Sequence, residues 1–206
     1  MSEPWLERWA AGRIGWHEPH GNRSLKKYWL GNGRRVLVPL CGKSVDLAWL
    51  EAQGNEVIGV ELSDLAARAF FEENDIEYRQ KNDGQRFEAI DRQITIVRGD
   101  YFEFYGELFD AHYDRGALAA LPANMRRRYA AHTNTLLTSN AMQLLIVLEY
   151  DQALADGPPF SITADEVLSY WPQLERVDAY NDIENAPRKF HDAGLTEFVE
   201  VVWRSR

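Results

Sequence analysis

The chain has little of several features that mark particular classes of protein. Its 206 residues include one cysteine, Cys41, which excludes an intramolecular disulfide and suits a reducing cytoplasm. No run of about eighteen apolar residues is present, and the first residues lack the apolar centre of a secretion signal. The net charge of −9 and a pI near 5.1 disfavour nucleic acid as the main partner. We therefore expect a cytoplasmic protein that binds neither nucleic acid nor membrane.

The sequence also lacks a complete phosphate-binding loop. An apolar run, 36–40, leads to a turn with one glycine, Gly42, where a dinucleotide-binding fold needs Gly-x-Gly-x-x-Gly. Leu37 stands where a P-loop ending in Gly42-Lys43-Ser44 needs its first glycine. A second apolar run, 57–62, carries Glu61 about twenty residues after the turn, the spacing at which an acid binds a nucleotide ribose.

This pattern favours a cofactor that has an adenosine but no pyrophosphate. S-Adenosylmethionine is the usual cofactor of that kind, and it fits better than NAD because the glycines are missing. An ordinary βαβ turn without a ligand is the alternative, since an acid after a strand is common.

Apolar periodicity predicts strands that alternate with helices, which is typical of a three-layer α/β domain. We expect a single domain over residues 1–206, with helical cover in residues 1–33 and a small hairpin within 78–93. The predicted strands are 36–40, 57–62, 94–98, 109–115, 143–150, 174–180 and 197–204. The predicted helices are 44–53, 63–74, 122–137 and 163–170, the last capped by Thr163.

Motifs along nearly the whole chain resemble those of the thiopurine S-methyltransferase family, in particular its bacterial members. They are Trp9 before Ile14-Gly-Trp-His17, Val36-Leu-Val-Pro-Leu-Cys-Gly-Lys-Ser44, Gly59-Val-Glu-Leu-Ser63, Gly99-Asp-Tyr-Phe102, Tyr113-Asp-Arg-Gly-Ala-Leu118, Leu148-Glu-Tyr150 and Gly157-Pro-Pro-Phe160. The resemblance implies a Rossmann-like methyltransferase fold with seven strands, mostly parallel, the last antiparallel. It also implies an S-adenosylmethionine-dependent enzyme, which we expect to be a monomer.

The resemblance assigns roles to individual residues. For the cofactor these are Trp9, Leu40, Gly42, Glu61 on the ribose, Asp100 and Tyr101 beside the adenine, and Arg115 near the carboxylate. For the acceptor they are Trp16, Arg115, Pro158 and either Arg188 or Lys189. Arg115 is the expected catalytic residue, because its charge favours a thiolate acceptor. A separate general base is then unnecessary; if one exists, His17 and Glu18 are nearest to Trp16 in sequence.

Structural roles are the alternatives for several of these residues. Asp100 can cap the following turn, Arg115 can pair with Asp110 or Asp114 on the surface, and Trp9 can be core. The run Arg126-Arg127-Arg128 reads as a solvated helix face. No metal site is expected, because the histidines are poorly spaced for one.

The sequence thus predicts methyl transfer to small thiols such as thiopurines, with selenium or tellurium anions as further acceptors. Other nucleophiles, halide or oxygen, are the alternative within enzymes. A binding protein that senses or buffers a ligand or metalloid without turnover is the alternative outside them.

Overall fold

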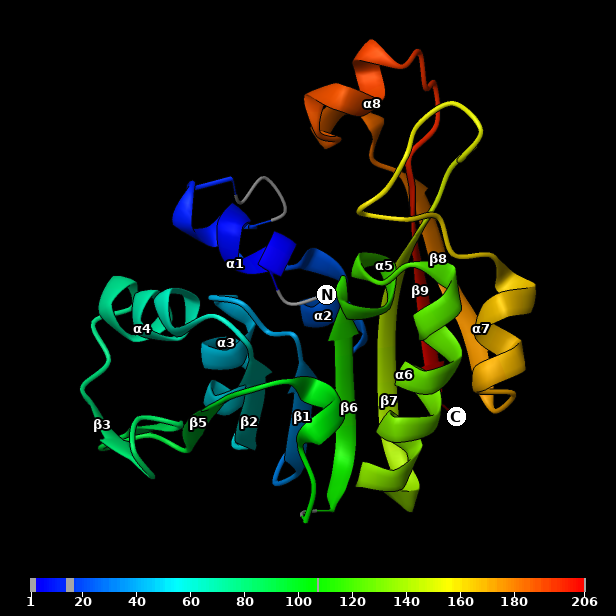
Figure 1. Ribbon diagram of the computed structural model, residues 1–206. Helices are drawn as coiled ribbons and strands as arrows, with labels where there is room; N and C mark the ends of the chain where they lie inside the picture. Colours follow the sequence, from blue (N-terminus) through cyan, green and yellow to red (C-terminus); the bar gives the residue numbers. More distant parts are fainter. Residues whose placement is uncertain (1–2, 14–16, 107, 206) are drawn as a thin grey trace. The chain divides into compact units, whose positions relative to one another are not determined.

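The computed structural model describes residues 3–13, 17–106 and 108–205 (Figure 1). The chain packs as two compact units, Met1–Ala111 and His112–Arg206. Strand β6 (Phe109–Arg115) contains the boundary between them. The expected single domain stays a prediction.

The first unit is built around three parallel strands, β1 (Arg35–Pro39), β2 (Glu56–Glu61) and β5 (Ile94–Arg98). β2 lies between the other two, with Val57 opposite Val36 and Glu61 opposite Arg98. The predicted hairpin is present as β3 (Tyr78–Lys81) and β4 (Arg86–Ala89), and β4 pairs antiparallel with β5. The strand order in this unit is therefore β3-β4-β5-β2-β1. The near-continuous burial of β1 and β2 is typical of parallel strands covered on both faces.

Two helices pack against this sheet. α3 (Asp46–Ala52) contacts β2 and β5, and α4 (Asp64–Glu73) contacts β2, β4 and β5. Ser63, rather than Asp64, caps α4, because its side chain accepts a hydrogen bond from the Ala66 amide. α3 starts later than predicted, with Val45 rather than Ser44 at its N-cap. The N-terminal cover segment forms α1 (Glu3–Ala10) and α2 (Arg23–Tyr28).

In the second unit, β9 (Val199–Ser205) runs antiparallel between β7 (Leu137–Glu149) and β8 (Leu174–Asn181). Helix α6 (Ala123–Leu136) packs against β7 and against α7 (Ala164–Tyr170). Thr163 caps α7 as predicted. The short helices α5 (Ala117–Ala120) and α8 (Arg188–Asp192) lie in segments that were expected to be connections. Two 3₁₀ turns, η1 (Tyr101–Glu103) and η2 (Ile183–Asn185), complete the elements of the two units.

The expected count of seven strands is wrong, because the described residues form nine. The two additional strands are those of the β3–β4 hairpin, which the sequence treats as an insertion rather than as part of the sheet. The antiparallel last strand is confirmed by the pairing of β9 with β7. The expectation of mostly parallel strands is wrong, because the pairing is mixed: β4 pairs antiparallel with β3 and β5, and β9 with β7 and β8. β7 starts at Leu137, earlier than the predicted 143. The prediction missed this part because residues 138–140 are polar, with Ser139 and Asn140 exposed, and interrupt the apolar run that marks the rest of the strand.

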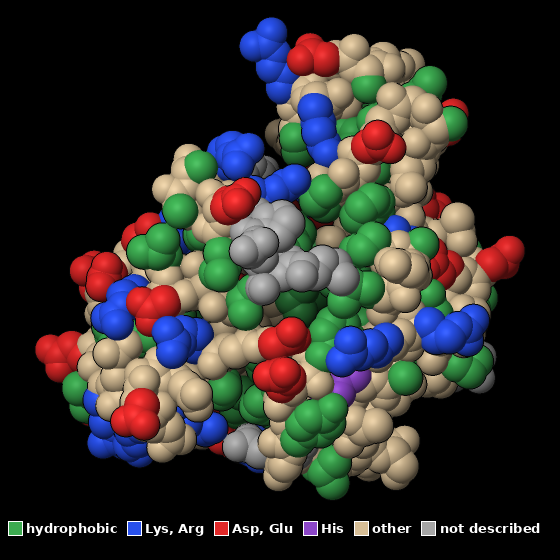
Figure 2. All heavy atoms as spheres, viewed as in Figure 1, with side chains coloured by type: hydrophobic (Ala, Val, Ile, Leu, Met, Phe, Trp, Pro, Cys, Tyr) green, Lys and Arg blue, Asp and Glu red, His purple; other side chains and the backbone are tan. Residues whose placement is uncertain are grey.

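Two surface properties bear on partners. On the face seen in Figure 2, acidic and basic side chains of the described residues are interspersed rather than gathered by sign. Among the residues that the structure describes, no helix combines the length and apolar character needed to cross a membrane.

Candidate functional site

Three of the predicted cofactor residues lie at the carboxyl ends of adjacent parallel strands. Leu40 follows β1, Glu61 is the last residue of β2, and Asp100 lies two positions after β5. The Gly99 amide donates to the Glu61 carbonyl at 2.9 Å, which ties the end of β5 to the end of β2. Open α/β sheets bind ligands at this edge, because the strand ends and their loops converge there.

The buried carboxylate of Glu61 joins two of these loops. Glu61 is only 7% exposed. Its Oε2 accepts a hydrogen bond from the Gly42 amide at 2.8 Å, and its Oε1 accepts one from the Ser63 amide at 2.7 Å. Burial raises the pKa of this carboxyl, and the amides of Ser63, Gly42 and Leu62 oppose the rise. Each carboxylate oxygen accepts up to two hydrogen bonds, so the carboxylate keeps acceptor capacity that suits a ribose hydroxyl.

The turn after β1 has the shape of a cradle. Leu40 (φ 46°) and Gly42 (φ 55°) are both left-handed, and the Cys41 amide between them donates to the Val60 carbonyl at 3.1 Å. A left-handed leucine is uncommon and strained, and such residues concentrate at ligand sites. Trp9 of α1 lies over the turn, since a Cβ on Gly42 would be 3.2 Å from Trp9 Cζ2.

Cys41 is enclosed behind this turn. It is buried, and a Cβ added to Gly59 would lie 2.5 Å from its Sγ. Burial, followed by the charge of Glu61, raises the pKa of the thiol well above its ordinary value. Packing is therefore the role of Cys41. Lys43 holds the far side of the turn, because its Nζ donates to both carboxylate oxygens of Glu73 on α4 at 2.6 and 2.7 Å.

Asp100 acts as a cap, which was the structural alternative for it. Its Oδ1 accepts a hydrogen bond from the Phe102 amide at 2.9 Å at the start of η1. The residue is exposed, whereas Tyr101 beside it is buried. An exposed carboxylate keeps acceptor capacity for an exocyclic amine, so a role beside adenine is compatible with the cap.

In the second unit, Arg115 is the last residue of β6, and the turn that follows it is organised by its neighbour. Asp114 is fully buried; its Oδ1 accepts from the amides of Ala117 and Leu118, and its Oδ2 accepts from the Tyr129 hydroxyl at 2.7 Å. Burial raises the pKa of Asp114 to about 6 against these bonds. The idea of Asp114 as a surface partner for Arg115 is thus wrong, because this carboxylate lies inside the unit.

The structure separates the two candidates for a second basic group. Arg188 is at the surface, with its side chain 90% exposed and its Nε 3.5 Å from Asp192 one turn along α8. Lys189 Nζ donates instead to the carbonyls of Asp156 and Pro158 at 2.8 and 2.7 Å. Pro158 and Lys189 are therefore brought together, and Arg188 is not part of this contact. Trp16 lies outside the described residues.

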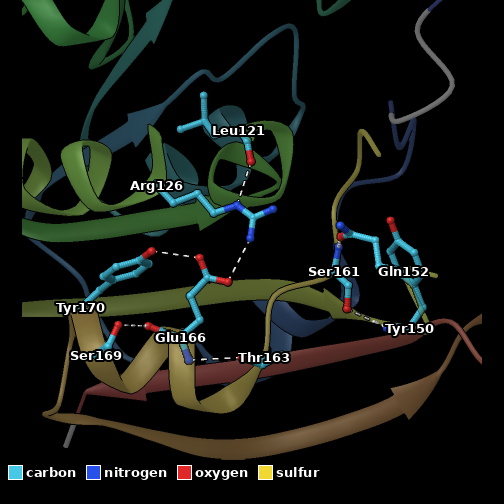
Figure 3. Close-up of polar contacts among 9 residues, drawn as sticks. All are labelled: Leu121, Arg126, Tyr150, Gln152, Ser161, Thr163, Glu166, Ser169 and Tyr170. Atoms are coloured by element: carbon cyan, nitrogen blue, oxygen red, sulfur yellow. Dashed lines mark hydrogen bonds and ion pairs between the residues drawn. The ribbon is translucent and has the colours of Figure 1, made fainter. Parts of the chain in front are cut away.

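Arg126 is a polar residue of this region to which the sequence assigned no part in a site. It was expected on a solvated face, yet it is 4% exposed and pairs with Glu166 of α7 at 2.9 Å (Figure 3). Helical spacing offered a signal, because Arg126 shares a face of α6 with the buried residues Tyr129, Ala130 and Thr133. The exposed Arg127 and Arg128 fit the expectation.

Comparison with solved structures defines the class of the fold. A 1,6-didemethyltoxoflavin-N1-methyltransferase from Burkholderia thailandensis, solved with S-adenosylhomocysteine, superposes with a TM-score of 0.66 at 20% identity, covering 99% of this chain and 86% of that one. A TehB-like S-adenosylmethionine-dependent methyltransferase from Corynebacterium glutamicum gives 0.56 at 16% identity, covering 100% and 98%. The fold is thus that of the Rossmann-like α/β methyltransferases.

Sequence comparison then gives the family. The family model for thiopurine S-methyltransferase matches residues 1–206. Curated relatives named thiopurine S-methyltransferase are 42% identical in Bordetella petrii, over 98% of this chain and 97% of the relative, and 41% identical in Pseudomonas putida, over 97% and 96%. The chain belongs to the thiopurine S-methyltransferase family. It is a methyltransferase, and its cofactor is S-adenosylmethionine.

Residues of the first unit fit this cofactor. The carboxylate of Glu61 has acceptor capacity for two hydroxyls, and the turn at Gly42 lets backbone approach a ligand where a side chain would meet Trp9.

Proposed function

We propose that the protein transfers the methyl group of S-adenosylmethionine to the sulfur of small thiols, aromatic thiols such as thiopurines among them. The observation that carries this proposal is the match of the family over the whole chain, together with relatives of equal length that bear the name thiopurine S-methyltransferase.

The bound cofactor supplies a sulfonium methyl, which is already activated for displacement, so the protein has mainly to hold the acceptor in line with it. In our proposal Glu61 holds the ribose hydroxyls, Leu40 and Gly42 contact the cofactor through their backbone atoms, and Trp9 covers the turn. Asp100 and Tyr101 flank the adenine. The two loop amides that hold the Glu61 carboxylate support its part, because they fix its orientation before a ligand arrives.

Arg115 is the proposed catalytic residue and contacts both cofactor carboxylate and acceptor. A guanidinium near an acceptor thiol lowers the thiol pKa, so the acceptor reacts as thiolate without a dedicated base. Trp16, Pro158 and Lys189 complete the proposed acceptor side. The contact of Lys189 with the Pro158 carbonyl supports Lys189 rather than Arg188 in that role.

Selenium and tellurium anions are proposed as further acceptors, because soft polarisable nucleophiles resemble thiolates in charge and reactivity. Methyl transfer to oxygen or halide is the competing enzymatic activity. As its setting we propose a monomer in the cytoplasm that acts on small molecules, supported by the acidic net charge and the single buried cysteine.

An acceptor panel tests this proposal. The purified enzyme is given S-adenosylmethionine with a thiopurine, an aliphatic thiol, selenite, tellurite and the hydroxypurine that carries oxygen in place of the thiopurine sulfur. Methyl transfer to the thiopurine with little to the hydroxypurine is the expected result. Equal or faster methylation of the hydroxypurine would overturn the assignment to sulfur, and binding of S-adenosylhomocysteine without any methylated product would overturn turnover of these acceptors.

A further inference from the structure

The loop Gly157–Phe160 is fastened to its own unit by backbone atoms at three successive residues. The Phe160 amide donates to the Ala119 carbonyl of α5 at 2.7 Å. The Tyr150 hydroxyl donates to the Pro159 carbonyl at 2.7 Å, and Lys189 Nζ donates to the Pro158 carbonyl at 2.7 Å. These bonds fix the position of the loop backbone. They do not fix the orientation of its one large side chain, Phe160.

Arg126 fixes that side chain. Its guanidinium carbon lies 5.3 Å from the centroid of the Phe160 ring, within the range of a cation–π contact. Its Nε donates to the Leu121 carbonyl at 2.8 Å, and its Nη1 donates to Glu166 Oε2 at 2.9 Å (Figure 3). A rigid guanidinium held at two of its nitrogens has one orientation, so the ring packed against it has one as well.

Glu166 is held in turn by α7. Its Oε1 accepts a hydrogen bond from the Tyr170 hydroxyl at 2.9 Å, and its amide donates to the side chain of Thr163 at 3.3 Å. Figure 3 shows the carboxylate of Glu166 between Arg126 and Tyr170, with one oxygen directed at each. The orientation of Phe160 is thereby linked to both α6 and α7.

The course of the loop depends on where the Phe160 ring lies. A Cβ added to Gly157 would overlap the ring, so the Gly157 backbone rests directly on it. A shift of the ring therefore moves Gly157 and the neighbouring Pro158 with it.

Stability alone does not explain an ion pair at this position. The Arg126 side chain is 4% exposed and that of Glu166 22%, so the pair is largely withdrawn from water. Replacing a buried ion pair by apolar side chains of similar volume is often neutral or stabilising. What the pair supplies, and an apolar pair would not, is a directional contact that selects one ring orientation.

We propose that Arg126 and Glu166 are positioning residues for the methyl acceptor, acting through Phe160 on the rim formed by Pro158 and Pro159. This inference rests on the proposed function, in which Pro158 borders the acceptor; Pro159 is its neighbour in the same loop. Neither residue touches the reacting atoms, so their influence falls on the acceptor KM and leaves cofactor affinity unchanged.

The test compares Arg126→Met with Arg68→Met. Arg68 is a matched control on α4, since it pairs with Asp64 at 2.6 Å and lies 5.5 Å from the Phe87 ring. For Arg126→Met we expect the KM for a thiopurine to rise roughly tenfold, with kcat at saturating acceptor and the Kd of S-adenosylhomocysteine within about twofold of native. Arg68→Met should leave all three near native. An unchanged KM in Arg126→Met, or a Kd that rises with KM, would overturn the proposal.

A second variant distinguishes an effect on the position of the loop from an effect on folding stability. It is needed because Arg126→Met leaves the charge of Glu166 without its ion-pair partner. The double variant Arg126→Met, Glu166→Met removes both charges, and we expect its Tm to recover towards native while the acceptor KM stays high. Recovery of KM together with Tm would show that the pair serves stability only.

Hydrogen exchange of the Phe160 amide gives a readout that needs no acceptor. We expect this amide to exchange at least tenfold faster in both Arg126 variants than in native protein or Arg68→Met, because loss of ring orientation weakens its bond to Ala119. Native exchange in the variants would overturn the positioning role. If the native enzyme methylates no thiol yet this amide loses protection in the variants, the proposed function fails while the positioning of the loop stands.

Discussion

Each unit contains a buried carboxylate at or next to the end of a strand, and the two differ in how completely they are bonded. Asp114 in the second unit accepts from two amides through Oδ1 and from the Tyr129 hydroxyl through Oδ2, with no exposed surface. Glu61 in the first unit accepts from backbone amides of the loops, those of Gly42 and Ser63 at 2.8 and 2.7 Å among them, and retains some exposure. Both have a raised pKa, and burial is the largest cause for each.

The comparison distinguishes Asp114, a carboxylate with a structural role, from Glu61, a carboxylate that keeps acceptor capacity for the proposed ligand. Three donors surround Asp114, including a side chain from another helix, and its task is to shape the turn after β6. Glu61 receives only loop amides, so a partner with two hydroxyl donors can complete its set. Burial and a raised pKa alone would have marked both as candidate ligand residues.

The largest expected effect is on cofactor binding in Glu61→Ala. This change removes the ribose acceptor and leaves the buried amides of Gly42 and Ser63 without a partner, each at a cost of about 1–3 kcal/mol. We expect the Kd of S-adenosylhomocysteine to rise at least about 100-fold, measured by calorimetric titration. Glu61→Gln, which keeps the shape and one acceptor, should be intermediate. Native-like affinity in Glu61→Ala would remove the distinction between the two carboxylates.

The next effect concerns stability against pH in Asp114→Asn. The pKa of Asp114 rises from 3.8 in the unfolded chain to about 6 in the folded one, so its stabilising contribution is complete below 3.8 and is lost as pH rises through 6. This loss amounts to about 3 kcal/mol. Asparagine cannot ionise, so the unfolding free energy of the variant relative to native should improve by up to that amount between pH 4 and pH 7.5.

Urea unfolding at the two pH values measures this difference, and Asp165→Asn at an exposed position of α7 is the control. A relative stability that is independent of pH would contradict the raised pKa. A loss of cofactor affinity in Asp114→Asn as large as in Glu61→Ala would contradict its structural role.

A smaller effect is expected from Gly42→Ala compared with Gly54→Ala. Both glycines have positive φ, 55° and 83°, so both variants carry the backbone strain of about 1 kcal/mol. Only at Gly42 would the new Cβ meet Trp9; at Gly54 nothing lies within 4 Å. We therefore expect Gly42→Ala alone to weaken binding of S-adenosylhomocysteine, by roughly fivefold. Equal binding by the two variants would show that Trp9 has no part in the cradle.

The smallest effect is expected from Lys189→Met. The lysine is exposed and donates to two carbonyls next to or within the loop, so its loss should raise the thiopurine KM by about threefold without changing cofactor affinity. Arg188→Met, which loses only a surface ion pair, should have the smaller effect of the two. The reverse order in steady-state kinetics would reassign the second basic group to Arg188.

The sequence predicted the first unit better than the second, for a physical reason. Leu40, Glu61 and Asp100 are placed by apolar runs and the turns after them, which are local patterns. The strand that follows each turn carries its last residue to the same edge, so position along the chain implies position in space.

The bonds of the second unit join residues far apart in the chain. Arg126 and Glu166 are forty positions apart, and Lys189 lies more than thirty positions after the loop carbonyls that it contacts. The three successive arginines 126–128 suggest a solvated helix face. Only the packing of α6 shows that one side of the helix, with Arg126 on it, is buried. The first unit has one miss of its own: the hairpin of β3 and β4 was predicted, but as an insertion and not as two strands of the sheet, because its residues are mostly polar.

The enclosure of Cys41 has a consequence for chemical durability. The thiol is covered by the turn and by Gly59, and its raised pKa keeps it protonated, whereas alkylation, disulfide exchange and oxidation all proceed through an accessible thiolate. If the acceptors are thiols and soft anions, as we propose, the same turn that we place beside the cofactor protects this cysteine from the enzyme's own reactants.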